Sequence, residues 1–354
     1  MKRIVLCLLP ALLLISISVQ VGAAVSSHGV IMLNGLTTAY GMNASLQVCG
    51  RDASGRAAVW SGGSTTALQT TGSTGYAYDI NNSGTVVGSS NGQAAVWDST
   101  GTMHYLTVPQ GTRQSSATAV NDDGMVAGSF TDSSNRSHAC YWLGGNMVDI
   151  SLPNVSNTVS GITSTGDILL NVLSSMSSGV FVYSHGSYNL VAGGLTHGDA
   201  TGYGISDNGA VAGDTYSPSV GQSEGFVWQN GTITRRFEGS EGWNMSATAV
   251  NSSGSVVGSE HYFGSEPLPS EFSGPFIWED SHSALLNDII SHPGGYYVSD
   301  AVTIDDSGSI LCNGYYSNHQ KCASLLMTPE PSSIAALMTG IACLGAVLRR
   351  RQSR

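Results

Sequence analysis

The stretch Ala117–Phe130, ATAVNDDGMVAGSF, decides the fold, because altered copies of it recur along most of the chain. Two short apolar segments flank a turn of Asn and Asp closed by Gly124. Asn and Asp side chains accept hydrogen bonds from a turning backbone, and glycine adopts the positive φ that tight turns need. The stretch therefore predicts two short antiparallel strands joined by a tight turn.

The copies recur at a nearly constant spacing. Clear copies begin at Ala77, Gly202 and Ala247, and weaker ones at Ala39, Val159 and Ala301. The last interval contains HYFGSEPLPSEFSG, which we expect to form a surface loop. The apolar residue before the turn lies 38 to 45 residues after its predecessor in five intervals and 54 residues after it in the last: Met42, Ile80, Val120, Ile162, Ile205, Val250 and Ile304.

Each copy has a second half that predicts two more strands. An apolar segment ends in an aromatic residue, and a glycine turn and a further short segment follow, as in GFVWQNGTITRRF. Because the aromatic residue has a fixed place in a buried strand, we expect it to pack between units rather than to stack on sugars. The aromatic positions are Trp60, Trp97, Trp142, Tyr183, Trp228 and Trp278.

Seven units of about forty residues predict an all-β fold, a seven-bladed β-propeller of four-stranded antiparallel blades. A linear β-solenoid is the alternative. The seventh copy lacks a fourth strand, whereas a spare strand, Gly29–Leu36, precedes the first copy. Pairing of this strand with Cys322–Met327 would close the ring and cover its edges, which favours the propeller.

The repeat resembles that of the HAF-repeat family of secreted bacterial proteins. The family pairs an INxxGxVVG hairpin with a His-Ala-Phe-like triplet before Trp, and the likeness covers nearly all of Gly29–Met327. The hairpin matches well. The triplet is approached only by HAC at His138–Cys140.

The N-terminus predicts export. Lys2 and Arg3 precede a leucine-rich stretch and small residues near Ala24, so residues 1–24 are typical of a secretory signal peptide. The predicted domain, residues 25–328, holds 23 acidic against 7 basic residues, a net charge of −16. Such a surface repels nucleic acid, so no nucleic-acid partner is expected, and it tolerates neutral or cationic partners.

The C-terminal residues 329–354 form a second targeting segment. The motif Pro329, Glu330 and Pro331 precedes an apolar run, residues 334–348, and the basic end 349–354 with Arg349, Arg350 and Arg351. We expect a single transmembrane helix whose arginines stay on the cytoplasmic side. Fifteen residues span only ~22 Å, short of the ~30 Å hydrocarbon core, which suits a temporary stop better than an ordinary anchor.

This combination resembles the PEP-CTERM sorting signal. The resemblance implies an exosortase-type membrane protease as partner, and a protein held transiently in the inner membrane. It then passes to the cell surface or an exopolysaccharide matrix.

No catalytic constellation, metal site or cofactor site emerges from the residue pattern. GQSEG at Gly221–Gly225 matches a hydrolase motif, but a strand follows where that motif needs a helix. NDDG and DDSG lack the alternating ligands of a calcium loop, so turn capping is expected. Trp243 lies outside the repeat pattern and is the candidate for an exposed contact.

The cysteines are expected to differ in state. Cys312 and Cys322 lie on neighbouring predicted strands, which predicts a disulfide under oxidising conditions. Cys49 and Cys140 belong to units that are not adjacent, which predicts buried thiols.

Two classes of function remain from the sequence. The first is a structural or binding module of the cell surface or matrix. The alternative is a propeller enzyme, a lyase or hydrolase acting on extracellular glycans at the central channel. Charged side chains converging at one channel end would distinguish the enzyme.

Overall fold

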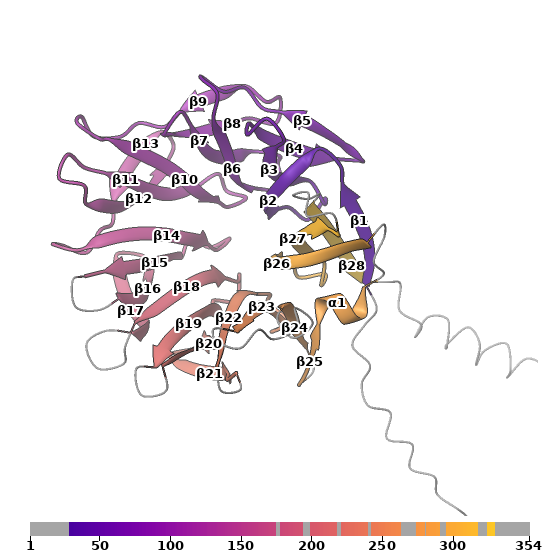
Figure 1. Cartoon of the computed structure of the whole chain (residues 1–354). Helices are drawn as coiled ribbons and strands as arrows, with labels where there is room; N and C mark the ends of the chain where they lie inside the picture. Colours follow the sequence, from indigo (N-terminus) through magenta and orange to yellow (C-terminus); the bar gives the residue numbers. More distant parts are fainter. Residues whose placement is uncertain are drawn as a thin grey trace, which may run out of the picture.

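The computed structural model describes residues 28–174, 178–193, 199–217, 221–239, 242–262, 274–279, 281–290, 295–317 and 324–329. Within these ranges the chain is almost entirely strand. Figure 1 shows the strands grouped into sheets that follow one another around the molecule. The described part contains one helix, α1 (Leu286–Ile289).

The strands form seven four-stranded antiparallel sheets. Six of them use consecutive strands, and the remaining one has the order β1-β28-β27-β26. The bounds are β1 (His28–Leu33), β2 (Leu36–Met42), β3 (Val48–Asp52), β4 (Ala57–Ser61), β5 (Ser64–Ala67), β6 (Gly75–Ile80), β7 (Val86–Ser90), β8 (Gln93–Trp97), β9 (Met103–Tyr105), β10 (Gln114–Val120), β11 (Val126–Thr131), β12 (Ser137–Leu143), β13 (Asn146–Asp149), β14 (Ser156–Ile162), β15 (Ile168–Leu173), β16 (Ser178–Ser184), β17 (Ser187–Gly193), β18 (Ala200–Ile205), β19 (Val211–Ser217), β20 (Gln222–Gln229), β21 (Thr232–Phe237), β22 (Trp243–Val250), β23 (Val256–Tyr262), β24 (Gly274–Glu279), β25 (His282–Leu285), β26 (Tyr296–Ile304), β27 (Ile310–Tyr316) and β28 (Ser324–Pro329).

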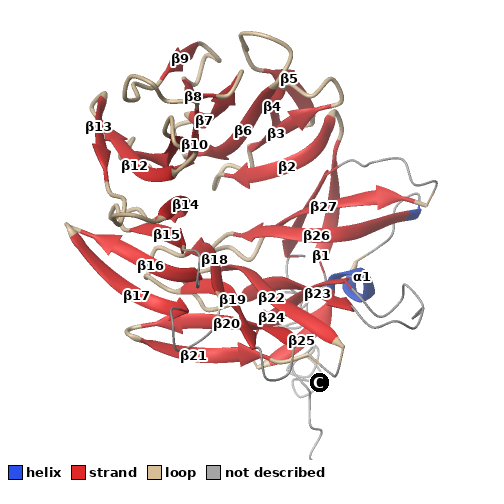
Figure 2. Ribbon diagram, turned by 60° about the vertical axis from the view of Figure 1, so that its left-hand side comes forward, coloured by secondary structure: helices blue, strands red, loops and turns tan. Residues whose placement is uncertain are grey.

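The sheets surround a common centre, as Figure 2 shows. One edge strand of each sheet faces this centre and is here called the inner strand. It is the first strand of the six consecutive sheets and β26 in the closing sheet. The inner strands are β2, β6, β10, β14, β18, β22 and β26. The predicted β-propeller of four-stranded antiparallel blades is thus confirmed.

The turn after each inner strand has the predicted chemistry. In the second copy the side-chain oxygen of Asn81 accepts hydrogen bonds from the amides of Ser83 and Thr85, at 3.1 and 2.9 Å. Gly84 follows with φ +81°, and its amide donates to the Asn81 carbonyl. The Asn81 amide group also donates to the Asn121 carbonyl of the next turn, at 2.9 Å. The repeated turn therefore also links neighbouring sheets.

The two ends of the repeat array meet in one sheet. The closing strand β1 pairs with β28, from His28 opposite Pro329 to Leu33 opposite Ser324, and the two strands lie side by side in Figure 1. The predicted pairing is confirmed, with corrected bounds. Leu36 belongs to β2, because the turn at Asn34 and Gly35 ends the closing strand earlier than expected.

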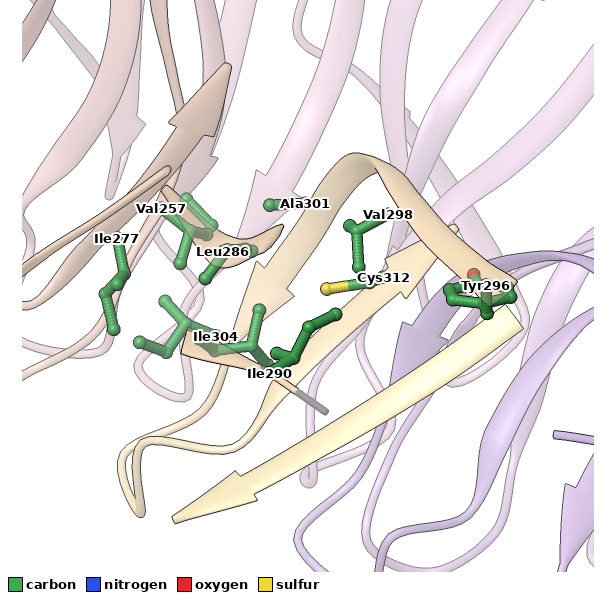
Figure 3. Close-up of a cluster of buried hydrophobic side chains, with 11 residues drawn as sticks. Val257, Ile277, Leu286, Ile290, Tyr296, Val298, Ala301, Ile304 and Cys312 are labelled. Carbon is green, nitrogen blue, oxygen red and sulfur yellow. The ribbon is translucent and has the colours of Figure 1, made fainter. Parts of the chain in front are cut away.

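The core is divided among the interfaces between sheets. Figure 3 shows one such cluster, in which Val257 and Ile277 of one sheet face Val298 and Ile304 of the next. Leu286 of α1 is fully buried in the same cluster. Because each cluster draws on two sheets, the sheets stabilise each other.

The repeated tryptophans pack between sheets, as predicted. Trp97 and Trp142 are buried, and each occupies the same register, opposite Val86 and Val126. Their indole N–H groups donate to the carbonyls of Gln69 and Thr107, at 2.6 and 2.7 Å, which belong to the segments that follow the preceding sheets.

The predicted transmembrane helix, residues 334–348, lies outside the described residues, as do the signal peptide and the arginine cluster. Among the residues that are described, no helix is long and apolar enough to span a membrane. The disulfide between Cys312 and Cys322 also stays a prediction, because Cys322 is not among them. Cys49 and Cys140 are buried thiols.

Candidate binding site at the central channel

A β-bulge in every inner strand shapes the channel wall. The register with the second strand shifts shortly before the turn in each inner strand, for example between Ala77 and Asp79 of β6, and leaves one extra residue there. Inner strands β2 and β26 have a further shift nearer their start. A bulge of this kind re-aims side chains next to functional sites. The extra residues all line the channel, which has a volume of about 230 Å³: Tyr40, Tyr78, Thr118, Ser160, Tyr203, Thr248 and Val302.

Sequence reasoning missed these residues, although the copies contain a signal for them. In β6, Ala77 and Ile80 are both buried while three residues apart. Strict alternation would place them on opposite faces of the strand, so this spacing requires an extra residue. A small residue three positions before the apolar one occurs in six of the seven copies, and Val159 takes its place in the fourth.

The residue directly after each bulge residue also lines the channel, and at one of these positions, Asp79, the side chain is a carboxylate. Most equivalent positions hold small residues, such as Gly41 and Ala119. Its two oxygens accept hydrogen bonds from the amides of Ile80 and Val120, each at 2.9 Å. Burial raises the pKa of Asp79 to about 6, although these two amides oppose the shift. Asp79 therefore joins the β6 and β10 sheets, and each of its oxygens accepts a backbone hydrogen bond.

A groove opens at the channel end where the inner strands begin. It has a volume of about 560 Å³ and lies across the sheets of β6, β10 and β14. Its lining consists of serine, threonine, tyrosine, asparagine and glutamine side chains, with glycine and valine. No charged residue is among the described residues that line it.

Tyrosines form the wall of the groove nearest the channel. Tyr76 and Tyr78 lie parallel, with ring centroids 5.5 Å apart, and Tyr40 packs edge-on against Tyr78 at 5.4 Å. The Arg51 guanidinium lies 4.2 Å from the centre of the Tyr76 ring and donates to the Gly55 carbonyl. These contacts hold the aromatic wall in place.

A second polar group lies further round the channel. The hydroxyls of Tyr203 and Ser246 both donate to one carboxylate oxygen of Asp214, at 3.1 and 2.8 Å. Burial raises the pKa of Asp214, and it raises the pKa of Tyr203 to about 12, with the neighbouring carboxylate adding to the effect. This group carries a carboxylate, unlike the groove.

At the opposite channel end, aspartate side chains in the turns accept hydrogen bonds from backbone amides. Asp122 accepts from the Asn82 amide at 2.8 Å, and Asp306 from the Ser252 amide at 2.8 Å. Asp305 accepts from the amides of Ser307 and Ser309. Turn capping is thus confirmed for Asp305, whereas Asp122 and Asp306 link the turns of neighbouring sheets. No group of His, Cys, Asp and Glu among the described residues could hold a metal ion.

The candidates from the sequence lie apart from the groove. Trp243 is half-buried at the start of β22, and Gly239 contacts it. Ser223 of the GQSEG match lies within β20. Pro329 is the last residue of β28, whereas Glu330, Pro331, Arg349, Arg350 and Arg351 are outside the described residues.

Comparisons with known proteins show the fold alone. No protein-family model matches the chain, and no curated protein matches it in sequence. A streptogramin B lyase structure has a TM-score of 0.54 at 11% identity, over 86% of this chain and 98% of that one. Virginiamycin B lyase from Staphylococcus aureus has a TM-score of 0.54 at 14% identity, over 84% and 98%.

Other similar structures belong to proteins of different kinds. A puromycin hydrolase has a TM-score of 0.54 at 10% identity, over 78% of this chain and 50% of that one. A chain of a mitotic checkpoint complex has a TM-score of 0.53 at 13% identity, over 93% and 99%. At such identities the shared propeller carries no function across.

Proposed function

We propose that this protein is an exported binding module of the cell surface or an exopolysaccharide matrix, and that its ligand is a glycan. The groove at the channel carries the proposal, because it is large, open and lined by uncharged polar side chains with a tyrosine wall. Small-molecule sites typically measure about 300–1,000 Å³. The carboxylates described at the channel are held by backbone amides or hydroxyls, which favours binding over catalysis.

The two ends of the sequence support export and sorting. The signal peptide, residues 1–24, precedes the domain, and the Pro-Glu-Pro motif begins at Pro329. Pro329 is also the last residue of β28 in the closing sheet, which supports a domain boundary close to the motif. An exosortase-type protease acting beyond Pro329 would release a complete propeller.

The test is the mass and location of the protein in an exosortase-competent host. We expect surface and matrix material to lack everything beyond about Pro331. Replacing Arg349, Arg350 and Arg351 with glutamine should impair sorting, because each arginine at the membrane centre costs roughly 2.5–3.5 kcal/mol on insertion scales. A tail intact through Arg354 in that material would make the segment a plain anchor. Absence of the protein from the matrix fraction would contradict the proposed function.

A second candidate is an enzyme, a lyase or hydrolase acting on extracellular glycans. The observation that favours it is the group of Tyr203, Asp214 and Ser246, since a carboxyl with a raised pKa beside hydroxyls can transfer protons. Release of reducing ends or unsaturated sugars from matrix polysaccharide would support it. Loss of that release in Asp214→Asn, with Glu224→Gln on the same sheet as control, would assign it to this group.

A further inference from the structure

We infer that the groove across β6, β10 and β14 binds an uncharged oligosaccharide and discriminates against carboxylated or sulfated ones. The inference rests on the proposed function in taking the ligand to be a glycan. It adds the place of binding and the chemical class of the sugar.

Polar side chains in the groove have hydrogen-bonding capacity left for a ligand. Among the described residues, the side-chain polar groups of Tyr76, Gln114, Ser116, Thr131 and Thr158 make no hydrogen bond to another described residue. A hydroxyl both donates and accepts, and so does the amide of glutamine. Sugar hydroxyls have the same dual character, so they match this lining in many orientations. A purely apolar ligand would leave these groups without partners, at a cost in affinity.

These polar groups are spread over neighbouring sheets. Tyr76 comes from β6, Ser116 from β10, Thr131 from β11 and Thr158 from β14, so three neighbouring sheets contribute. A ligand that reaches all of them must extend across two interfaces between sheets. A chain of sugar units is a better match than a single unit.

The described lining of the groove offers no cationic side chain to a charged sugar. A carboxylated or sulfated sugar needs a cation to offset its desolvation, and no lysine, arginine or histidine is among the residues that line the groove. The Arg51 guanidinium lies on the Tyr76 ring and donates to Gly55. That of Arg113, next to Gln114 in the sequence, donates to the side chain of Asn135 at 2.7 Å. The net charge of −16 over residues 25–328 also repels anions.

The test measures binding of defined oligosaccharides to the exported protein. The probes are neutral tetramers of glucose, mannose or galactose, and uronic acid and sulfated tetramers of the same length. The variant Thr131→Val/Thr158→Val removes two hydroxyls with little change of shape. Thr66→Val is the matched control, because Thr66 is exposed on β5 and lies outside the groove.

We expect at least one neutral tetramer to bind, and the double variant to weaken this binding by about fivefold or more, since it removes two hydrogen bonds. Thr66→Val should bind as the unaltered protein does, and charged tetramers should bind at least tenfold more weakly. Equal binding by the double variant, a preference for charged tetramers, or no neutral ligand would overturn the inference. Matrix association that persists in the double variant would leave the proposed function standing while this groove assignment falls.

Discussion

At the scale of single residues, Asp79 is a channel carboxylate whose environment favours the protonated form. Its carboxylate is enclosed at the interface of the β6 and β10 sheets, and burial raises its pKa to about 6. The folded protein therefore holds this proton more tightly than the unfolded chain, whose ordinary Asp pKa is about 3.9. It follows that folding and proton binding at Asp79 are linked.

We expect the Asp79 contribution to stability to fall as pH rises from about 4 to about 6, and to level off above that. Asp79→Asn should lack this part of the pH dependence, although it also loses one acceptor for the amides of Ile80 and Val120. The measurement is the free energy of unfolding by urea at several pH values, taken as the difference between the two proteins. A difference that stays constant from pH 4 to pH 7 would contradict the assigned shift.

Gly88 is a residue whose identity follows from close backbone approach. A Cβ atom added there would lie 1.8 Å from the carbonyl oxygen of Tyr76, across the bulged ladder of β6 and β7. We expect Gly88→Ala to lower the free energy of unfolding by about 1–3 kcal/mol, the usual effect of overpacking. Ser99→Ala, at an exposed turn of the same sheet, is the control. Equal stability of Gly88→Ala and the unaltered protein would show that the strand can shift without cost.

At the scale of elements, the closing strand β1 can be tested along its own length. Leu33 is 0% exposed and packs with Leu36 and Leu311, whereas Ile31 is 38% exposed. We expect Leu33→Ala to lower the free energy of unfolding by about 2–5 kcal/mol. Ile31→Ala should lower it clearly less, because only the Leu33 substitution leaves a cavity in the core. Urea unfolding of both variants measures the difference. A similar loss of stability in the two variants would contradict the burial of Leu33 and the exposure of Ile31 on β1.

The elements also show what the sequence could predict and what it could not. The turn of Asn121 to Gly124 and the place of Trp142 predicted strands, turns and sheet packing, because both are local. A similar turn recurs in all seven copies and an aromatic residue in six of them. The groove was not predicted, since it depends on which neighbours adjacent sheets bring together. Thr131 and Thr158 are ordinary strand residues in the sequence, and only the ring places them on one surface. Trp243 is half-buried at the start of β22, and its role as an exposed contact stays a prediction.

At the scale of the whole molecule, ring closure depends on one strand supplied by the opposite end of the array. A chain that lacks residues 28–33 would leave β28 as an unpaired edge, which favours association with another chain. We expect this variant to form dimers or larger species in light scattering after size-exclusion chromatography. A synthetic peptide of residues 28–33 should restore the monomeric elution position. A stable monomer without the peptide would show that the ring does not need the strand.

The pairing of His28 with Pro329 has a mechanical consequence. Both ends of the domain lie at the same end of one antiparallel ladder, so a pull on the two ends breaks the ladder one residue pair at a time. Such unzipping requires less force than sliding two strands past each other. A domain fixed at both ends would therefore open first at this sheet under tension, while the other sheets keep their own hydrogen bonds. A protein held by its tail alone would transmit drag through β28 and leave β1 unstrained.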